Sequence, residues 1–283
     1  MSRQEEKSFT ARFGEVLTSR QSLLCVGLDP EIEKLPAGLP RTVQGLVRFC
    51  REIIAATTPF AAAFKINFAF FEALGTLGWA ALAEVAAALP ATTLRIADAK
   101  RGDIANSARL YARALFEELP FDAVTVNPYL GADAARPFLE NPARGAFFLC
   151  RTSNPGSGGI QQYPAPPGGG TATPLYLHVA EQVARWNTHD NAGLVVGATH
   201  PAELQKIREK CPHLPLLIPG VGAQGGDLES AVRVGATAAG NLAVINASRA
   251  IIYADGSSNF AEAAARQAEA LRNQMRACLK AKT

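Results

Sequence analysis

Eight short apolar runs alternate with longer helical patterns along the 283 residues of this chain. The apolar runs have the length of β-strands and cover residues 22–28, 62–67, 94–98, 123–127, 146–150, 193–197, 214–219 and 243–246. The amphipathic or alanine-rich stretches between and after them cover residues 42–57, 79–89, 107–118, 175–187, 201–210, 228–234 and 260–279. Eight strands that alternate with helices predict an α/β protein folded as a closed parallel (β/α)8 TIM barrel. Such a barrel commonly takes about 250 residues, so we expect a single domain over residues 1–283.

The composition excludes several classes of function. Hydrophobic residues make up 48% of the chain and charged residues 19%, which is typical of a globular protein with a large core. The net charge of +3 comes from scattered Lys and Arg and indicates no nucleic-acid partner. No apolar run reaches the roughly 18 residues of a membrane span. Residues 1–20 lack the apolar core of a signal peptide and are interpreted as a first helix, so we expect a cytoplasmic protein.

The cysteines and histidines predict neither a metal site nor a redox motif. The five cysteines, Cys25, Cys50, Cys150, Cys211 and Cys278, form no C-x-x-C pair. The four histidines show no metal-ligand spacing. Free thiols in a reducing compartment are therefore expected.

One segment interrupts the alternation of strands and helices. Residues 154–174 read NPGSGGIQQYPAPPGGGTATP, a composition that predicts neither helix nor strand. Composition alone would suit a linker. Because strands and helices resume afterwards, we expect a long loop over one face of the barrel, and loops of this length are usually functional or disordered.

The run RIADAKRGDIANS, residues 95–107, concentrates charge directly after the third predicted strand. Side chains two apart in a strand point to the same side, so Asp98 and Lys100 should project together. Gly102 then turns the chain, and Asp103 opens a helical segment on a different face. A lysine flanked by carboxylates stays protonated, which suits an acid and not a nucleophile. The alternative is a surface ion pair followed by Asp103 as a helix N-cap.

Polar residues also follow the other predicted strands. Asp29 follows the first strand, Lys65 lies within the second, Asn127 ends the fourth, and Thr152 and Ser153 follow the fifth. Active sites of such barrels gather at the carboxyl ends of the strands. Burying Lys65 in so apolar a run would be costly without a partner. The alternative is a lysine at a strand end whose ammonium group reaches solvent.

The last two predicted strands are followed by features that suit an anion. Residues 219–227 read PGVGAQGGD, and repeated glycines allow backbone N–H groups to surround an anion near the start of a helix. Arg249 follows the eighth strand, where barrels frequently bind phosphate. The alternative for Arg249 is an ordinary surface cation.

The runs GLDP, FKIN, DAKRGDI, PGVGAQGG and ASR, in this order, resemble the orotidine 5′-phosphate decarboxylase family. The stretch TSNPGS and the chain length point to its subgroup of longer bacterial enzymes, type 2. The resemblance covers residues 23–254, whereas the Asp-x-Lys-x-x-Asp element alone is shared with sugar-phosphate decarboxylases of the same superfamily. Two departures are the long segment 154–174 and the longer spacing from Gln224 to Arg249, which leaves the start of the eighth strand open.

The resemblance implies a set of catalytic residues. They form an alternating charge array, with Lys100 as the group that stabilises negative charge and donates a proton: Lys65, Asp98, Lys100 and Asp103. Asp103 is expected to come from the partner subunit of a homodimer with shared active sites. Ile104 and Ser107 are expected to reach that same neighbouring site.

The resemblance also implies how substrate is bound. Asp29 would hold a ribose hydroxyl, and Ser153 would contact the pyrimidine ring. Gln224 would belong to a mobile loop that closes over the phosphate, which Arg249 binds. The implied substrate is a small nucleotide, orotidine 5′-phosphate, which loses CO₂ to give UMP without a cofactor or metal. This reaction is the last step of de novo pyrimidine synthesis.

Three other functions stay open on the residues alone. A related sugar-phosphate decarboxylase or aldolase would use the Asp-x-Lys-x-x-Asp element with Mg²⁺ and would be sensitive to chelators. An aldolase that forms a Schiff base would need a neutral lysine in an apolar pocket. A nucleotide-binding barrel without turnover would show no activity with orotidine 5′-phosphate.

Overall fold

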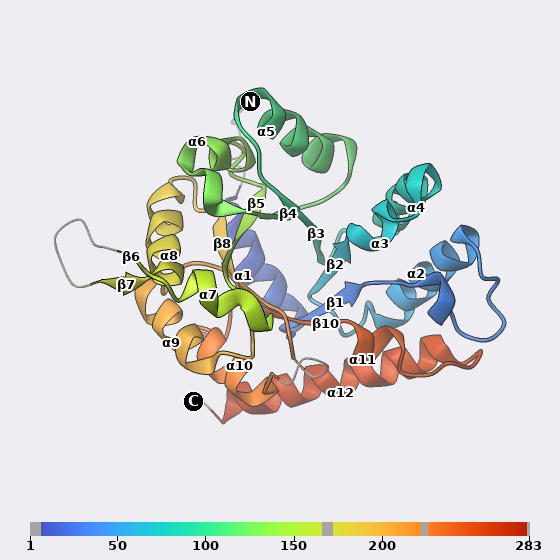
Figure 1. Cartoon of the computed structure of the whole chain (residues 1–283). Helices are drawn as coiled ribbons and strands as arrows, with labels where there is room; N and C mark the ends of the chain where they lie inside the picture. Colours follow the sequence, from blue (N-terminus) through green and yellow to red (C-terminus); the bar gives the residue numbers. More distant parts are fainter. Residues whose placement is uncertain (1–6, 166–171, 222–225, 282–283) are drawn as a thin grey trace, which may run out of the picture.

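The computed structural model describes residues 7–165, 172–221 and 226–281. Its centre is a closed barrel of eight strands in the order β1-β10-β9-β8-β5-β4-β3-β2 (Figure 1). All neighbouring barrel strands are parallel. The strands are β1 (Leu24–Leu28), β2 (Ala63–Asn67), β3 (Leu94–Arg101), β4 (Ala123–Val126), β5 (Gly145–Arg151), β8 (Ala192–Val196), β9 (Leu216–Ile218) and β10 (Ala243–Ala247). The predicted (β/α)8 barrel is confirmed.

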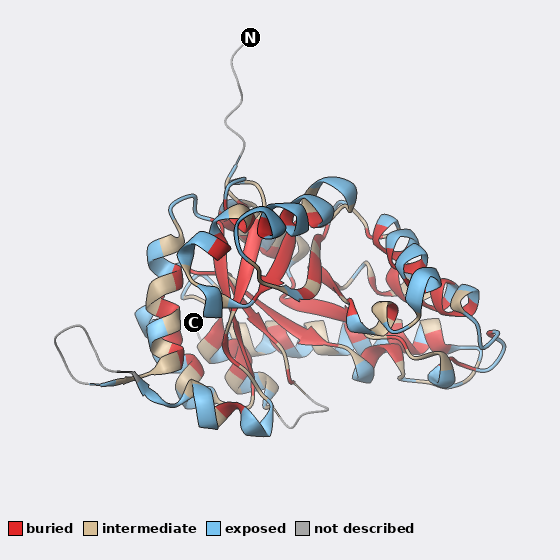
Figure 2. Ribbon diagram, turned by 45° about the horizontal axis from the view of Figure 1, so that its top comes forward, coloured by how far each residue is buried: buried red, intermediate tan, exposed pale blue. Residues whose placement is uncertain are grey.

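Helices surround the barrel and turn their buried faces toward it, while their outer faces are exposed (Figure 2). They are α1 (Phe9–Arg20), α2 (Val43–Thr57), α3 (Ala69–Glu72), α4 (Gly75–Ala87), α5 (Ala105–Arg113), α6 (Ala132–Ala135), α7 (Gly158–Gln161), α8 (Leu175–Trp186), α9 (Pro201–Lys210), α10 (Leu228–Gly235), α11 (Arg249–Ile252) and α12 (Phe260–Lys280). The last helix packs against α2, α10 and α11, and so completes the outer ring. None of the helices in the described ranges is long and apolar enough to cross a membrane.

Side-chain caps fix where several helices begin. The hydroxyl of Ser8 accepts a hydrogen bond from the backbone of α1, and Thr42 does the same for α2. Asp227 caps α10 by accepting from the backbone N–H of Ser230. Such caps satisfy N–H groups that have no partner inside the helix. The cap on α10 fixes this helix directly after the glycine-rich segment.

A buried carboxylate holds together the amino-terminal end of the barrel. Asp122 directly precedes β4, and its side chain is 2% exposed. Its two oxygens accept hydrogen bonds from Nε and Nη2 of Arg95, both at 2.9 Å. Arg12 of α1 and Arg144 bond the same carboxylate at 3.0 and 3.4 Å. This cluster ties α1 to the starts of β3, β4 and β5, at the end of the barrel opposite the predicted site.

The prediction that residues 154–174 hold neither helix nor strand is wrong. The segment contains a 3-10 turn at Pro155–Ser157, the one-turn helix α7, and an antiparallel pair of β6 (Pro164–Ala165) with β7 (Thr173–Pro174). A single turn can form despite its glycines because side chains at its end bond to neighbouring elements. Gln161 bonds to the end of β5, and Gln162 bonds to Glu203 of α9.

Two boundaries differ around the charged run. The strand predicted over residues 94–98 continues to Arg101, with a register shift against β4 between Ala97 and Arg101. The helix predicted over residues 107–118 consists of α5 and a π-helical turn at Ala114–Glu118. The strand predicted over 243–246 agrees with β10 to within one residue.

Candidate active site

A cavity of about 280 Å³ opens at the carboxyl ends of the barrel strands. Its lining includes most residues that the sequence singles out there: Asp29, Lys65, Asp98, Lys100, Thr152, Ser153 and Arg249. They come from five parts of the sequence and meet because parallel strands end on the same side of a barrel. This cavity is the candidate active site.

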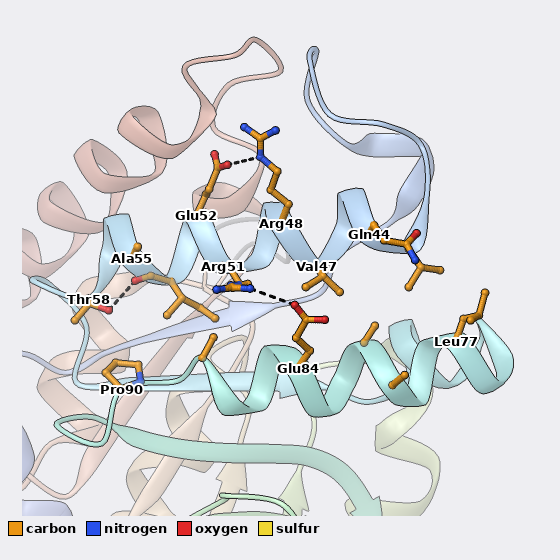
Figure 3. Close-up of a pocket in the computed structure, with 15 residues that line it drawn as sticks. Gln44, Val47, Arg48, Arg51, Glu52, Ala55, Thr58, Leu77, Glu84 and Pro90 are labelled. Carbon is orange, nitrogen blue, oxygen red and sulfur yellow. Dashed lines mark hydrogen bonds and ion pairs between the residues drawn. The ribbon is translucent and has the colours of Figure 1, made fainter.

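A larger depression, about 750 Å³, lies outside the barrel between α2 and α4 (Figure 3). Its charged side chains bond to one another, Arg48 to Glu52 at 2.7 Å and Arg51 to Glu84 at 3.2 Å. Helices outside a barrel support the fold, whereas chemistry gathers at the strand ends. Size alone therefore does not identify the site.

Two lysines share one carboxylate at the bottom of the cavity. Nζ of Lys65 lies 2.7 Å from Oδ2 of Asp98, and Nζ of Lys100 lies 2.6 Å from Oδ1. The Lys65 side chain is 5% exposed and the Asp98 side chain 11%, while Lys100 is 51% exposed. The array therefore has a buried ammonium group at Lys65 and an accessible one at Lys100. The alternatives of a surface ion pair and of a solvent-reaching Lys65 do not fit this burial.

The backbone of β3 is shaped to bring Lys100 back over Asp98. Lys100 has a left-handed φ of 45°, within the register shift against β4. Thr125 of β4 stabilises this conformation because its hydroxyl accepts from the Lys100 backbone N–H at 3.0 Å. The same hydroxyl donates to Oδ1 of Asp98 at 3.0 Å. Left-handed backbone costs free energy for a residue with a side chain, and such strain is found mostly at functional sites.

Each charged group of the array stabilises the charged form of its neighbour. Burial alone would raise the pKa of Asp98, but the ammonium groups of Lys65 and Lys100 outweigh it and hold that pKa well below its usual range. Burial alone would lower the pKa of Lys65, but Asp98 and Asp29 outweigh it and raise that pKa. Both groups are therefore charged throughout the neutral pH range.

Two buried polar atoms in the cavity wall have no hydrogen-bond partner among the described residues. Oδ1 of Asp29 is buried and lies 4.0 Å from Nζ of Lys65, and it accepts no hydrogen bond within the described residues. Oγ of Ser248 is also buried and has no hydrogen-bond partner among the described residues. Buried polar atoms are normally hydrogen-bonded, so both atoms are suited to a ligand.

Glycine permits close packing in this wall. A Cβ on Gly27 would lie 2.8 Å from Cβ of Ser248 and 3.0 Å from Oδ1 of Asn246. A side chain at this position would therefore push β1 away from the end of β10 and displace Ser248.

Three predicted site residues lie outside the cavity formed by one chain. Asp103 uses Oδ1 to accept from the backbone N–H of Ile104 at 2.8 Å. Ile104 is 59% exposed, and Ser107 is also exposed at the start of α5. Asn127 directly follows β4, as expected, but its side chain caps the 3-10 turn at Pro128–Leu130 and does not line the cavity. Gln224 lies outside the described residues.

Sequence reasoning missed five polar residues of the cavity: Asn67, Thr125, Asn154, Asn246 and Ser248. Thr125 precedes Asn127 by two positions, so the alternation of side chains along a strand could have indicated it. Asn246 and Ser248 precede Arg249, and only the closed barrel shows that they reach the cavity. Asn246 is buried and accepts from the thiol of Cys25 at 3.6 Å, while burial raises the pKa of that thiol to about 12.

Replacing Asp98 by Asn should destabilise the fold in a pH-dependent way, because it removes the carboxylate that is bonded directly to the buried Lys65 and leaves only the more distant Asp29. The native pKa of Asp98 is depressed. Its contribution is therefore full above the unfolded pKa of about 3.9 and is lost as pH falls through the lower native value. The difference in unfolding free energy between the parent and Asp98→Asn should be constant from about pH 5 to 9 and shrink below about pH 4. Denaturation of both chains across this range tests the prediction, and a difference that fades near neutral pH would contradict it.

Several known proteins are similar to this chain in sequence and fold. Residues 22–265 match the Orotidine 5′-phosphate decarboxylase / HUMPS family. The chain is 49% identical over 263 residues to orotidine 5′-phosphate decarboxylase of Herpetosiphon aurantiacus. The aligned residues cover 93% of this chain and 96% of that relative. It is 51% identical to the protein of the same name from Roseiflexus sp., over 93% of this chain and 95% of the relative.

A solved structure agrees with these sequence matches. The structure of Leishmania donovani OMP decarboxylase is similar with a TM-score of 0.81 and 39% identity, over 95% of this chain and 98% of that one. The matched range includes every described residue of the cavity. This chain therefore belongs to the orotidine 5′-phosphate decarboxylase / HUMPS family.

Proposed function

We propose that this chain removes CO₂ from orotidine 5′-phosphate to give UMP, the last step of de novo pyrimidine synthesis. The observation that carries this proposal is the pair of ammonium groups on the two oxygens of Asp98, one buried and one facing the cavity. This arrangement holds a proton donor beside a fixed negative charge. The names of relatives about half identical over 93% of the chain support it.

Lys100 is suited to the chemical step. When the bond between the pyrimidine ring and its carboxylate breaks, the electron pair stays on the ring carbon and CO₂ leaves. The ammonium group of Lys100 stabilises this charge and then transfers its proton to the same carbon. Lys100 is left as the neutral amine and regains a proton from solvent after UMP departs.

Charge repulsion between Asp98 and the substrate carboxylate contributes only part of the catalysis. Two unit charges about 4 Å apart interact by roughly 4 kcal/mol at an effective dielectric near 20. Enzymes lower barriers by roughly 8–23 kcal/mol. The larger share must come from interactions that are stronger in the transition state than in the ground state. Binding the remote phosphate and closing the site serve this purpose.

The remaining cavity residues are suited to the rest of the nucleotide. Oδ1 of Asp29, buried and without a hydrogen bond in the described chain, is placed to accept one from a ribose hydroxyl. Lys65 lies between Asp29 and Asp98 and can donate to the same sugar. Ser153 lies across the cavity wall at the end of β5, where the pyrimidine ring would lie.

The phosphate would bind where β9 and β10 end. Arg249 opens α11 and is exposed at the cavity, and Ser248 beside it has an unbonded hydroxyl. Gly220 lines the same region and has a φ of 97°, a conformation that favours glycine. We propose Arg249 as the phosphate ligand, with Gln224 as a second one on the neighbouring segment.

We further propose a homodimer in which each site takes residues from both chains. Large apolar side chains are exposed on the elements that follow the adjacent strands β3 and β4: Ile104, Leu110, Tyr111, Tyr129 and Leu130. Exposed apolar patches of this kind mark interaction surfaces. Asp103 and Ser107 lie beside this surface, so a second copy would bring them to its neighbour's cavity.

The array argues against the alternative reactions. A Mg²⁺-dependent reaction would need carboxylate oxygens, but both oxygens of Asp98 are engaged by ammonium groups. A Schiff-base aldolase would need a neutral amine, whereas acidic neighbours raise the pKa of Lys65.

The proposed reaction should be seen directly. The parent chain should convert orotidine 5′-phosphate to UMP, followed by absorbance, and should keep its rate after treatment with EDTA. Binding of nucleotide without turnover would indicate a non-catalytic barrel. Loss of turnover that Mg²⁺ restores would favour the metal-dependent relatives.

Replacing Arg249 by Ala should act through the phosphate. The variant should lose most of its activity on orotidine 5′-phosphate, because a charge-assisted bond to the phosphate is removed. Its much slower decarboxylation of orotidine, which has no phosphate, should barely change. Steady-state rates on both substrates check this, and equal fold losses would contradict the assignment.

Mixing two inactive variants should restore activity if sites are shared. In a dimer of one Lys100→Ala chain and one Asp103→Ala chain, one site carries both lesions and the other carries none. Random mixing in equal amounts makes about half of the dimers mixed, so about a quarter of all sites should be active. Activity that stays at the level of the separate variants, with subunit exchange shown independently, would exclude shared sites.

A further inference from the structure

The short helix α7 sends one side chain back to the wall of the cavity. Oε1 of Gln161 accepts from the backbone N–H of Thr152 at 2.9 Å. Its Nε2 donates to Oγ1 of Thr152 at 2.8 Å. Thr152 directly follows β5 and lines the cavity together with Ser153 and Asn154. A residue of the segment 154–174 thus holds part of the candidate active site.

Arg151 fixes which way the Gln161 amide points. Its side chain is 3% exposed, and its Nη1 lies 3.2 Å from Oε1 of Gln161. A guanidinium group donates and cannot accept, so the oxygen of Gln161 must face it. The amide nitrogen of Gln161 must then face the hydroxyl group of Thr152.

The hydrogen bond from Gln161 to Thr152 also determines how the side-chain amide of Asn154 is oriented. Because Oγ1 of Thr152 accepts from Gln161, its own proton goes to Oδ1 of Asn154 at 2.6 Å. The amide group of Asn154 is oriented by this bond, with the oxygen toward Thr152. Its NH₂ group has no hydrogen-bond acceptor within the described residues, and Asn154 lines the cavity.

We propose that Gln161 is a positioning residue for base recognition, which acts through Thr152 to present the NH₂ group of Asn154 to a carbonyl oxygen of the pyrimidine ring. This inference rests on the proposed function, because it takes the ligand to be a pyrimidine nucleotide. The pyrimidine carbonyls can only accept, so the orientation of the Asn154 amide decides whether it bonds or repels them.

The neighbouring Gln162 provides a matched control. It has the same side chain and the next position in the chain, but it bonds to Glu203 of α9 at 3.0 Å, and it is exposed. Gln162 therefore helps to attach α7 to the outer helices, while Gln161 bonds to the cavity wall. A purely structural role of α7 would make the two residues equivalent.

Replacing Gln161 by Glu tests the relay with little change in size. A carboxylate has no donor, so Thr152 would donate to it, and Asn154 would have to turn its NH₂ group toward Thr152. Its oxygen would then face the base. UMP should bind about tenfold more weakly, the equivalent of one hydrogen bond, while ribose 5-phosphate, which has no base, should bind as before. Gln161→Ala frees the Thr152 hydroxyl without reversing it, so it should show a smaller selective loss, and Gln162→Ala should bind both ligands as the parent does.

Calorimetric titration of UMP and of ribose 5-phosphate, with melting temperatures of all variants, provides the measurement. If Gln161 acts through Asn154, Asn154→Ala combined with Gln161→Glu should bind UMP no more weakly than Asn154→Ala alone. Additive losses, equal losses for both ligands, or an equal effect of Gln162→Ala would each overturn the inference. Failure of the parent chain itself to bind UMP would instead overturn the proposed function, and base recognition with it.

Discussion

The buried ion pair between Lys65 and Asp98 is the interaction on which the rest of the site depends. Both side chains sit at the mouth of an otherwise apolar barrel, where an unpaired charge would be very costly. Removing one partner of such a pair typically costs about 3–5 kcal/mol. The pair also leaves one oxygen of Asp98 for Lys100. The carboxylate that neutralises the buried Lys65 therefore also holds the ammonium group of Lys100 at the cavity.

The barrel supports this arrangement from several strands at once. Asn67 is paired in register with Asp98, and Gly27 with Lys65, so β1, β2 and β3 align the charged residues side by side. Thr125 from β4 holds both Asp98 and the backbone of Lys100. At the opposite end, Asp122 with its arginines ties together the starts of β3, β4 and β5. Buried ion pairs therefore stabilise the barrel at both ends, and the candidate active site lies at only one of them.

Much of this could be predicted because eight strands alternating with helices are typical of a closed parallel barrel, in which the polar strand ends meet. The convergence of Asp98, Lys65 and Lys100 followed from strand ends alone. The left-handed backbone at Lys100 could not be predicted, because it depends on the hydroxyl of Thr125 across a strand pair. The helix α7 within residues 154–174 was also missed. Its glycines and the nearby prolines predict a loop, and the helix is stabilised by hydrogen bonds to the end of β5 and to α9. Asp103, Ile104 and Ser107 do not line the cavity of one chain, so the roles proposed for them require a second copy.

We propose that the ammonium group of Lys100 supplies the proton that replaces CO₂. The most direct test compares turnover of orotidine 5′-phosphate with binding of UMP in the parent chain and in Lys100→Ala. The variant should lose nearly all turnover while its affinity for UMP largely survives, because Lys65, Asp98 and the proposed phosphate site remain. A variant with turnover within about tenfold of the parent, a barrier change of only about 1.4 kcal/mol, would contradict it.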